Sequence, residues 1–172
     1  MPVNLVSLNI VGPNPGEWAR LAGCVVFCNA VGSLGALSTS EAVRTWYPTL
    51  REPALSPPPW VFGPVWTLLY TLMGVALWLL WRRRGGARSL QRTALAWFAF
   101  QLTLNAAWSP VFFGAQNLGL ALVVIVAMLA AIALTMWAAR PVHPAVPWLL
   151  APYLAWVAFA TYLNAGYWAL NR

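Results

Sequence analysis

The stretch TALAWFAFQLTLNAAWSPVFFGAQNLGLALVVIVAMLAAIALTMWAA, from Thr93 to Ala139, runs for 47 residues without a charged side chain. A helix needs about 20 mostly apolar residues to cross the hydrocarbon core of a bilayer. The stretch is therefore too long for one spanning helix, and it contains a natural break at residues 109–117, SPVFFGAQN. We predict two spanning helices joined by a tight turn.

The rest of the chain contains three more windows of this kind. They hold 20 residues between Arg20 and Glu41, 29 between Glu52 and Arg82, and 31 between Arg140 and Arg172, where His143 is the single residue able to carry a charge near neutral pH. We therefore expect an all-α fold, an integral membrane bundle of five transmembrane helices. The predicted spans lie near residues 19–39, 59–81, 93–112, 118–139 and 147–168. Residues 1–18 are expected to form an N-terminal tail, and residues 19–172 one five-helix transmembrane domain.

Composition and charge support a membrane protein and indicate its orientation. The chain is 61% hydrophobic and 8% charged, whereas soluble domains carry about 25% charged residues. Its net charge of +7 comes from arginines placed at span ends, so we expect contact with anionic membrane lipid and no nucleic acid partner. The side that holds the N-terminus carries Arg20, Arg82, Arg83, Arg84, Arg88, Arg92 and Arg140, and the other side carries Arg44, Arg51 and Arg172. This bias predicts a cytoplasmic N-terminus if the protein lies in a bacterial inner membrane.

No residue pattern predicts a conventional catalytic or metal site. Cys24 and Cys28 share one face of the first span, but no His, Asp or Glu accompanies them, which favours apolar packing over metal binding. Haem-attachment, phosphate-loop and Ser/His/Asp patterns are absent from the sequence. No Asp, Glu, Lys or Arg lies deep in any predicted span, which argues against ion-coupled transport and leaves facilitated passage of a lipophilic ligand open.

Aromatic and polar residues form stripes on three predicted spans. The third span has Gln101, Asn105, Trp108 and Phe112; the second has Phe62, Trp66, Tyr70, Met73 and Leu77; the fifth has Pro152, Trp156, Ala160, Leu163 and Tyr167. At 100° per residue each set keeps to one side of its helix. Such stripes pack helix against helix or line a ligand pocket. The polar residues Gln101 and Asn105 would supply the polarity of such a pocket, or Asn105 would clamp two helices together by bonding to a backbone group.

The loop at residues 39–58 contains Trp46 and Tyr47, and it ends in the proline run at residues 57–59. Proline fits the first turn of a helix, so the run predicts a stiff entry into the second span. The two aromatic rings suit the interfacial zone of a membrane. Two interpretations remain open: a lid over the outward mouth of the bundle, or an interfacial anchor.

Three runs of sequence together resemble the TspO/MBR family, the translocator proteins formerly called peripheral-type benzodiazepine receptors. The runs are WY (46–47), LREP (50–53) and PPPWVFGPVWTLLY (57–70) in the loop and second span; QLTLNAAWSPVFFG (101–114) in the third; and PYLAWVAFATYLN (152–164) with Asn171 in the fifth. They keep the family's order and spacing over about residues 19–172. One departure is Leu55, where many family members carry an aromatic residue.

The resemblance implies a five-helix bundle, usually dimeric, that binds protoporphyrin IX, sterols and benzodiazepine-site compounds. Regulation or movement of these ligands is the implied role, with porphyrin as a ligand and no cofactor required. The implied ligand-binding residues are Trp46, Tyr47, Pro57, Trp66, Asn105, Trp108, Trp156, Ala160 and Leu163. A loose sterol motif is matched by Leu163, Tyr167 and Arg172.

The resemblance also suggests an alternative, a light-dependent enzyme that degrades porphyrin. An excited porphyrin can oxidise a nearby indole, so Trp66 and Trp156 would then be the catalytic residues. Because the sequence supplies no general acid, general base or metal site, the chemistry would be that of the ligand itself.

Overall fold

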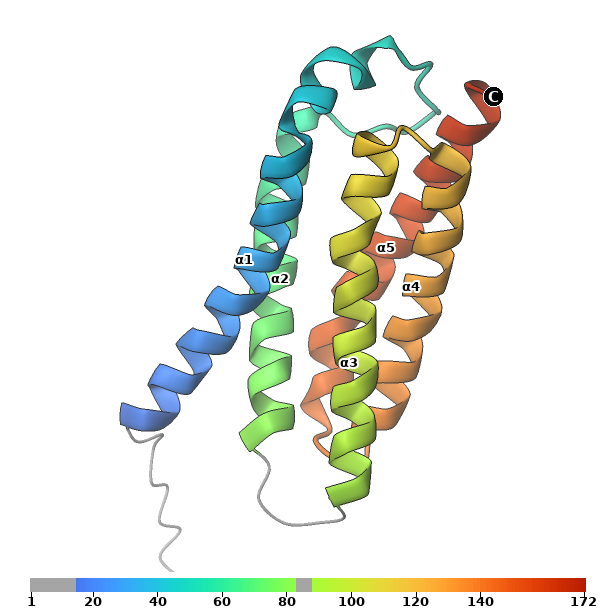
Figure 1. Cartoon of the computed structure of the whole chain (residues 1–172). Coiled ribbons are helices and arrows are strands. Elements are labelled where there is room, and N and C mark those ends of the chain that lie inside the picture. The colour runs from blue at the N-terminus through green and yellow to red at the C-terminus, as the bar shows by residue number, and fades with distance from the viewer. Residues whose placement is uncertain (1–14, 83–87) are drawn as a thin grey trace, which may run out of the picture.

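The structure is a computed structural model that describes residues 15–82 and 88–172, and every regular element in these residues is helical (Figure 1). Five long helices lie side by side: α1 (Pro15–Thr45), α2 (Pro59–Arg82), α3 (Arg88–Ser109), α4 (Leu118–Ala139) and α5 (Ala145–Leu170). Two short helical turns join them, η1 (Tyr47–Thr49) and η2 (Pro110–Gly114). The predicted all-α class is confirmed.

The bundle is that of an integral, multi-pass membrane protein. By length and hydropathy, four of its helical segments are able to cross a membrane: Pro15–Leu37 within α1, and the whole of α2, α4 and α5. The remaining long helix, α3, has the same length as α4, but Arg92, Gln101 and Asn105 lower its mean hydropathy. The predicted count of five spans is therefore not confirmed by composition.

The helix bounds differ from the predicted spans mainly in α1. This helix begins at Pro15 and ends at Thr45, so part of the segment expected to be loop is helical. Proline at the first position suits a helix start, and after Thr45 the chain passes through Trp46 into the short helical turn η1. Of the tail expected at residues 1–18, residues 15–18 form the start of α1, and residues 1–14 lie outside the described residues.

The predicted break between the third and fourth spans is confirmed at residues 110–117. A π-helical turn ends α3, with the Ala115 N–H donating to the Pro110 carbonyl at 2.8 Å. Asn117 then caps α4, because its side-chain oxygen accepts a hydrogen bond from the Leu120 N–H at 2.9 Å. The two helices are thus joined by a turn that satisfies its own backbone groups.

The two ends of the bundle differ in charge. We call the end with residues 46–58 and the C-terminus the loop end, and the opposite end the basic end (Figure 1). The described arginines of the basic end are Arg20, Arg82, Arg88, Arg92 and Arg140, and those of the loop end are Arg44, Arg51 and Arg172. Arg83 and Arg84 fall outside the described residues. Which end faces the cytoplasm remains a prediction.

The basic half of the bundle has a close-packed core. Met73, Leu80, Phe98, Ile132 and Leu150 are all at most 1% exposed. Gly74 lets α1 approach α2 closely, because a Cβ at this position would overlap the Val25 backbone. A larger residue at position 74 would force these two helices apart.

Candidate functional site

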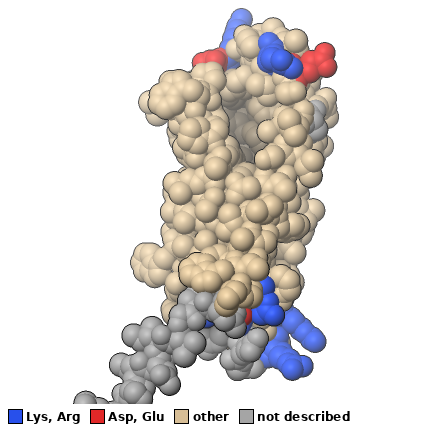
Figure 2. Space-filling view, turned by 90° about the vertical axis from the view of Figure 1, so that its left-hand side faces the viewer, with Lys and Arg blue, Asp and Glu red and all other residues tan. Residues whose placement is uncertain are grey.

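The loop half of the bundle encloses a chamber of about 910 Å³, which all five long helices line. Along α2 the lining ends at Tyr70, and along α3 and α5 it reaches Asn105 and Trp156, so these residues form its floor. The space-filling view from the α1 and α2 side shows the surface hollowed near the loop end (Figure 2). The volume of the chamber lies in the range of about 300–1,000 Å³ usual for small-molecule pockets.

Aromatic rings from α2, α3 and α5 pack around the chamber. Trp66 stacks on Tyr70 with ring centroids 5.4 Å apart, and Trp156 meets Phe62 edge to face at 5.8 Å. Trp108 lies on Phe112 at 5.0 Å. The three stripes seen in the sequence therefore converge on one space, with α2 and α5 joined through their rings.

Asn105 is the centre of a polar network at the chamber floor. Its side-chain oxygen accepts a hydrogen bond from the Tyr70 hydroxyl, and its amide nitrogen donates to the Tyr153 hydroxyl at 2.9 Å. Tyr153 in turn donates to the Met128 sulfur at 3.4 Å. Of the two roles left open for Asn105, the helix clamp is observed, although it uses side chains rather than backbone and links four helices. Asn105 also lines the chamber.

Gln101 does not share this site. Its side chain is 0% exposed, and neither its oxygen nor its nitrogen has a hydrogen-bond partner. It lies one helical turn from Asn105 toward the basic end, outside the chamber lining. The expectation that Gln101 contributes polarity to a pocket is wrong, because the packed core begins at this level.

The loop between α1 and α2 covers the chamber and is fixed to α5. The Tyr47 and Tyr167 hydroxyls lie 2.6 Å apart in a hydrogen bond. Arg51 exchanges two backbone hydrogen bonds with the Asn171 side chain, at 2.8 and 3.0 Å. Pro53 packs directly on Gly166, where a Cβ would overlap it. This geometry is that of the predicted lid.

The surroundings of the Tyr47 hydroxyl also change its pKa. Burial, and then the hydrogen bond to Tyr167, raise the pKa of Tyr47. The Tyr47 hydroxyl is therefore protonated over the physiological pH range, and the bond between lid and α5 persists across it.

The structure brings together most of the residues singled out from the sequence. Tyr47, Pro57, Trp66, Asn105, Trp108, Trp156, Ala160 and Leu163 all line the chamber. Trp46 does not: it packs behind the lining, edge to face against Phe112 at 6.1 Å, because the chain turns after α1. Of the sterol motif, Leu163 and Tyr167 line the chamber, whereas the Arg172 guanidinium lies over the Trp168 ring at 5.2 Å.

Sequence reasoning missed the contribution of α1. Gly32, Gly35, Ala36 and Thr39 form much of the wall opposite the aromatic stripes. These residues carry no aromatic ring, so no stripe marked them. The run of small residues in α1 could have indicated this wall. Small residues are needed there because the Tyr70 ring lies where a side chain at Gly32 would be.

Electrostatically the chamber is almost neutral. Its charged lining residues are Arg44 and Glu52, both near the loop end. Within residues 15–82 and 88–172, no group of three His, Cys, Asp or Glu residues is placed to hold a metal ion. The arrangement thus suits an apolar ring system, with room for a charged substituent at its mouth.

These features define a helical membrane protein with an aromatic chamber, and comparison with known sequences gives its family. The TspO/MBR family matches residues 24–169. The chain is 44% identical to the translocator protein of Homo sapiens over 144 residues, 81% of this chain and 85% of that one. It is 39% identical to the tryptophan-rich protein TspO of Archaeoglobus fulgidus (88% and 97%) and 37% identical to the tryptophan-rich sensory protein of Cereibacter sphaeroides (90% and 93%). The chain belongs to the TspO/MBR family.

Proposed function

We propose that this protein is a membrane receptor that binds flat, lipophilic ring ligands in the chamber, with tetrapyrroles such as protoporphyrin IX foremost, and sterols and benzodiazepine-site compounds as further candidates. The observation that carries the proposal is an aromatic chamber of about 910 Å³ inside a membrane bundle. A ligand that arrives from lipid has already left water, so its affinity must come from ring stacking and close packing. Trp66, Trp108 and Trp156 supply those surfaces.

We further propose that α3 crosses the membrane as the fifth span, with the N-terminus on the cytoplasmic side. Its polar residues Gln101 and Asn105 are at most 7% exposed, so they do not oppose insertion as lipid-facing polar groups would. The basic end, which has five described arginines and Glu17, would face the cytoplasm. A homodimer in the membrane is part of this proposal.

Entry of the ligand is proposed to occur laterally, from the bilayer. Figure 2 shows the surface hollowed on the α1 and α2 side near the loop end, and the chamber lining includes the small residues Gly35, Ala36 and Gly63 of these two helices. A ligand dissolved in the bilayer would enter through this hollow. Assistance to ligand movement would then consist of uptake from lipid and release to lipid, without an ion gradient.

The test is a binding titration with protoporphyrin IX, followed by tryptophan-fluorescence quenching of the detergent-solubilised protein. Trp66→Ala and Asn105→Leu are each expected to weaken binding about tenfold, through a lost stacking partner and a disturbed floor. Trp148→Ala is the matched control, because Trp148 is 80% exposed and lies outside the chamber. Unchanged porphyrin affinity in both chamber variants would show that these two residues do not belong to the binding site.

A light-dependent, porphyrin-degrading enzyme is a second candidate function. The observation that favours it is that Trp66 and Trp156 both line the chamber, so an excited porphyrin would have two indoles as possible electron donors. Illumination of the loaded protein tests the idea. Loss of bleaching in a Trp66→Phe, Trp156→Phe double variant that still binds porphyrin would support enzymatic use of these rings, and bleaching at the parent rate would exclude it.

A further inference from the structure

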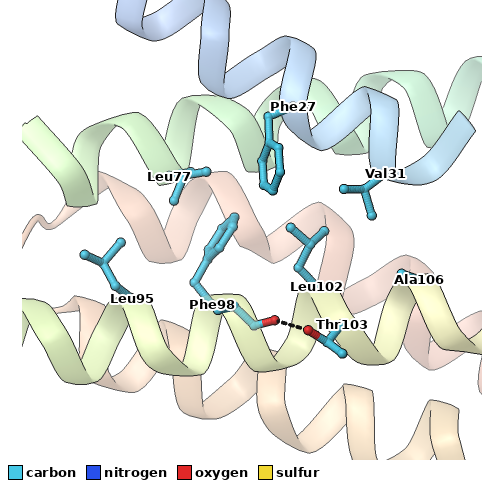
Figure 3. Close-up of a pocket in the computed structure, with 9 residues that line it drawn as sticks. Phe27, Val31, Leu77, Leu95, Phe98, Leu102, Thr103 and Ala106 are labelled. Atoms are coloured by element: carbon cyan, nitrogen blue, oxygen red, sulfur yellow. Dashed lines mark hydrogen bonds between the residues drawn. The ribbon is translucent and has the colours of Figure 1, made fainter. Parts of the chain in front are cut away.

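Two hollows of the structure differ in charge. One, of about 450 Å³ between α1 and α3, is lined by apolar side chains, among them Phe27, Leu77 and Phe98 (Figure 3). Its one hydroxyl, on Thr103, already donates to the Ala99 carbonyl at 2.9 Å. This hollow therefore offers no polar group that distinguishes one apolar molecule from another. The chamber does, because charged side chains line its mouth.

The mouth of the chamber carries one cation and one anion. Arg44, in the last turn of α1, and Glu52, in the lid, are the charged residues of the described lining, and both are exposed. Figure 2 shows basic and acidic side chains gathered at this end, above the hollow. Neither Arg44 nor Glu52 forms an ion pair within the described part of the chain. Both charges are thus available to a ligand.

The backbone beside each charge is held in place. Arg44 belongs to α1, and its Nε donates to the Ser40 carbonyl at 3.3 Å, which leaves the two terminal nitrogens of the guanidinium for a ligand. In the lid, the Arg51 backbone is hydrogen-bonded to the Asn171 side chain at 2.8 and 3.0 Å. The next residue but one, a proline, packs on α5. Contacts on both sides therefore fix the Glu52 backbone at the mouth.

The shape of a tetrapyrrole determines which of its groups meet these charges. Its ring system is flat and apolar, so it fits between the aromatic side chains of the chamber. The two propionate groups of protoporphyrin IX lie along one edge of the ring, so both would emerge at the mouth. One carboxylate can pair with the Arg44 guanidinium. The other would then lie near the Glu52 carboxylate, and the two negative charges would repel each other.

We propose that the chamber selects tetrapyrroles with a single free carboxylate, whose second acid group is esterified or otherwise uncharged. Arg44 attracts the free carboxylate, and Glu52 disfavours a second one. Selection of one ligand over a close relative commonly combines an attractive and a repulsive group in this way. This selectivity rests on the tetrapyrrole binding proposed above, and it adds Glu52 as a residue that determines specificity.

Three porphyrins that differ in charge test the proposal: protoporphyrin IX, its monomethyl ester and its dimethyl ester. Each is titrated into the detergent-solubilised protein at neutral pH, with tryptophan-fluorescence quenching as the readout. The parent is expected to prefer the monomethyl ester. Glu52→Gln should raise the affinity for the diacid about threefold, the scale of an exposed charge pair, and leave the dimethyl ester unchanged. Arg44→Gln should weaken the monomethyl ester about threefold, again without an effect on the dimethyl ester.

The quantity to compare is the ratio of monomethyl ester affinity to diacid affinity, because differences in detergent partitioning cancel when this ratio is compared between variants. Glu41→Gln is the matched control, since it removes the same charge from the same end of the molecule outside the chamber lining. It should keep the parent ratio. An unchanged ratio in Glu52→Gln, or an equal change in Glu41→Gln, would overturn the proposed selectivity. If none of the three porphyrins bound the parent, the proposed function itself would fail.

Discussion

At the basic end the helices meet mainly through aliphatic and small side chains such as Met73, Ala76 and Ile132, with few rings such as Phe98 among them, whereas at the loop end they meet mainly through indole and phenol rings. Aliphatic side chains change rotamer to fill the space between helices, and methionine is especially adaptable. The rings are rigid and stack on one another, as Trp66 does on Tyr70. Beside small residues such as Gly35 and Ala160 they leave a space open. The same five helices therefore form a solid core in one half and a chamber in the other.

The boundary between the halves is polar. Tyr70, Asn105 and Tyr153 are hydrogen-bonded at the floor of the chamber, and the packed core begins below them. A satisfied network of this kind fixes the relative positions of the helices that it joins. We infer that stability depends mainly on the basic half and ligand affinity mainly on the loop half.

The largest expected effect is on stability, from Gly74→Ala. The added Cβ would overlap the Val25 backbone, so α1 and α2 must separate, and we expect a loss of about 3 kcal/mol in the free energy of unfolding. Thermal unfolding in detergent measures it. Gly23→Ala is the control, since nothing lies within 4 Å of a Cβ at that position of the same helix pair. Equal melting temperatures for the two variants would contradict a close-packed basic half.

An intermediate effect is expected from Gly166→Ala, which acts on the lid. A Cβ here would meet Pro53, so the lid should lift from α5, and porphyrin should dissociate about fivefold faster with little change in melting temperature. Stopped-flow fluorescence measures the rate. Gly114→Ala is the control at the same end of the molecule, with open space around the added carbon. A dissociation rate equal to that of the control would show that the lid does not retain the ligand.

The smallest expected effect concerns charge at the mouth of the chamber. Protoporphyrin IX carries two carboxylates, and Arg44 is the cation in the described lining. Arg44→Gln should weaken porphyrin binding about threefold, as expected for a solvent-exposed ion pair, and leave sterol binding unchanged. Arg172→Gln removes a charge from the same end without touching the chamber. If Arg44→Gln lowered the affinity for porphyrin and for sterol equally, Arg44 would act through packing and not through its charge.

Sequence reasoning predicted the helical class, the break within residues 109–117 and the three aromatic stripes, because each depends on local sequence pattern. It did not predict the wall formed by α1, since Gly32 and Ala36 have no side-chain pattern that distinguishes a pocket from helix packing. Gln101 and Asn105 share one face of α3, but they differ in depth relative to the partner helices. Gln101 lies at the level of the packed core and Asn105 at the level of the chamber. This difference is set by tertiary packing, which the sequence pattern does not show. Trp46 was expected in the pocket from the family resemblance, but its ring packs against Phe112 and does not line the chamber.

The central claim is tested most directly by filling the chamber. Ala160 lines it beside the Trp156 ring, and Ala160→Phe would occupy empty space without displacing the core of the basic half. We expect protoporphyrin IX affinity to fall at least about tenfold, with the melting temperature unchanged or raised, while Ala158→Phe on the exposed face of α5 binds as the parent does. Parent-like porphyrin affinity in a correctly folded Ala160→Phe variant would place the ligand elsewhere and contradict the account.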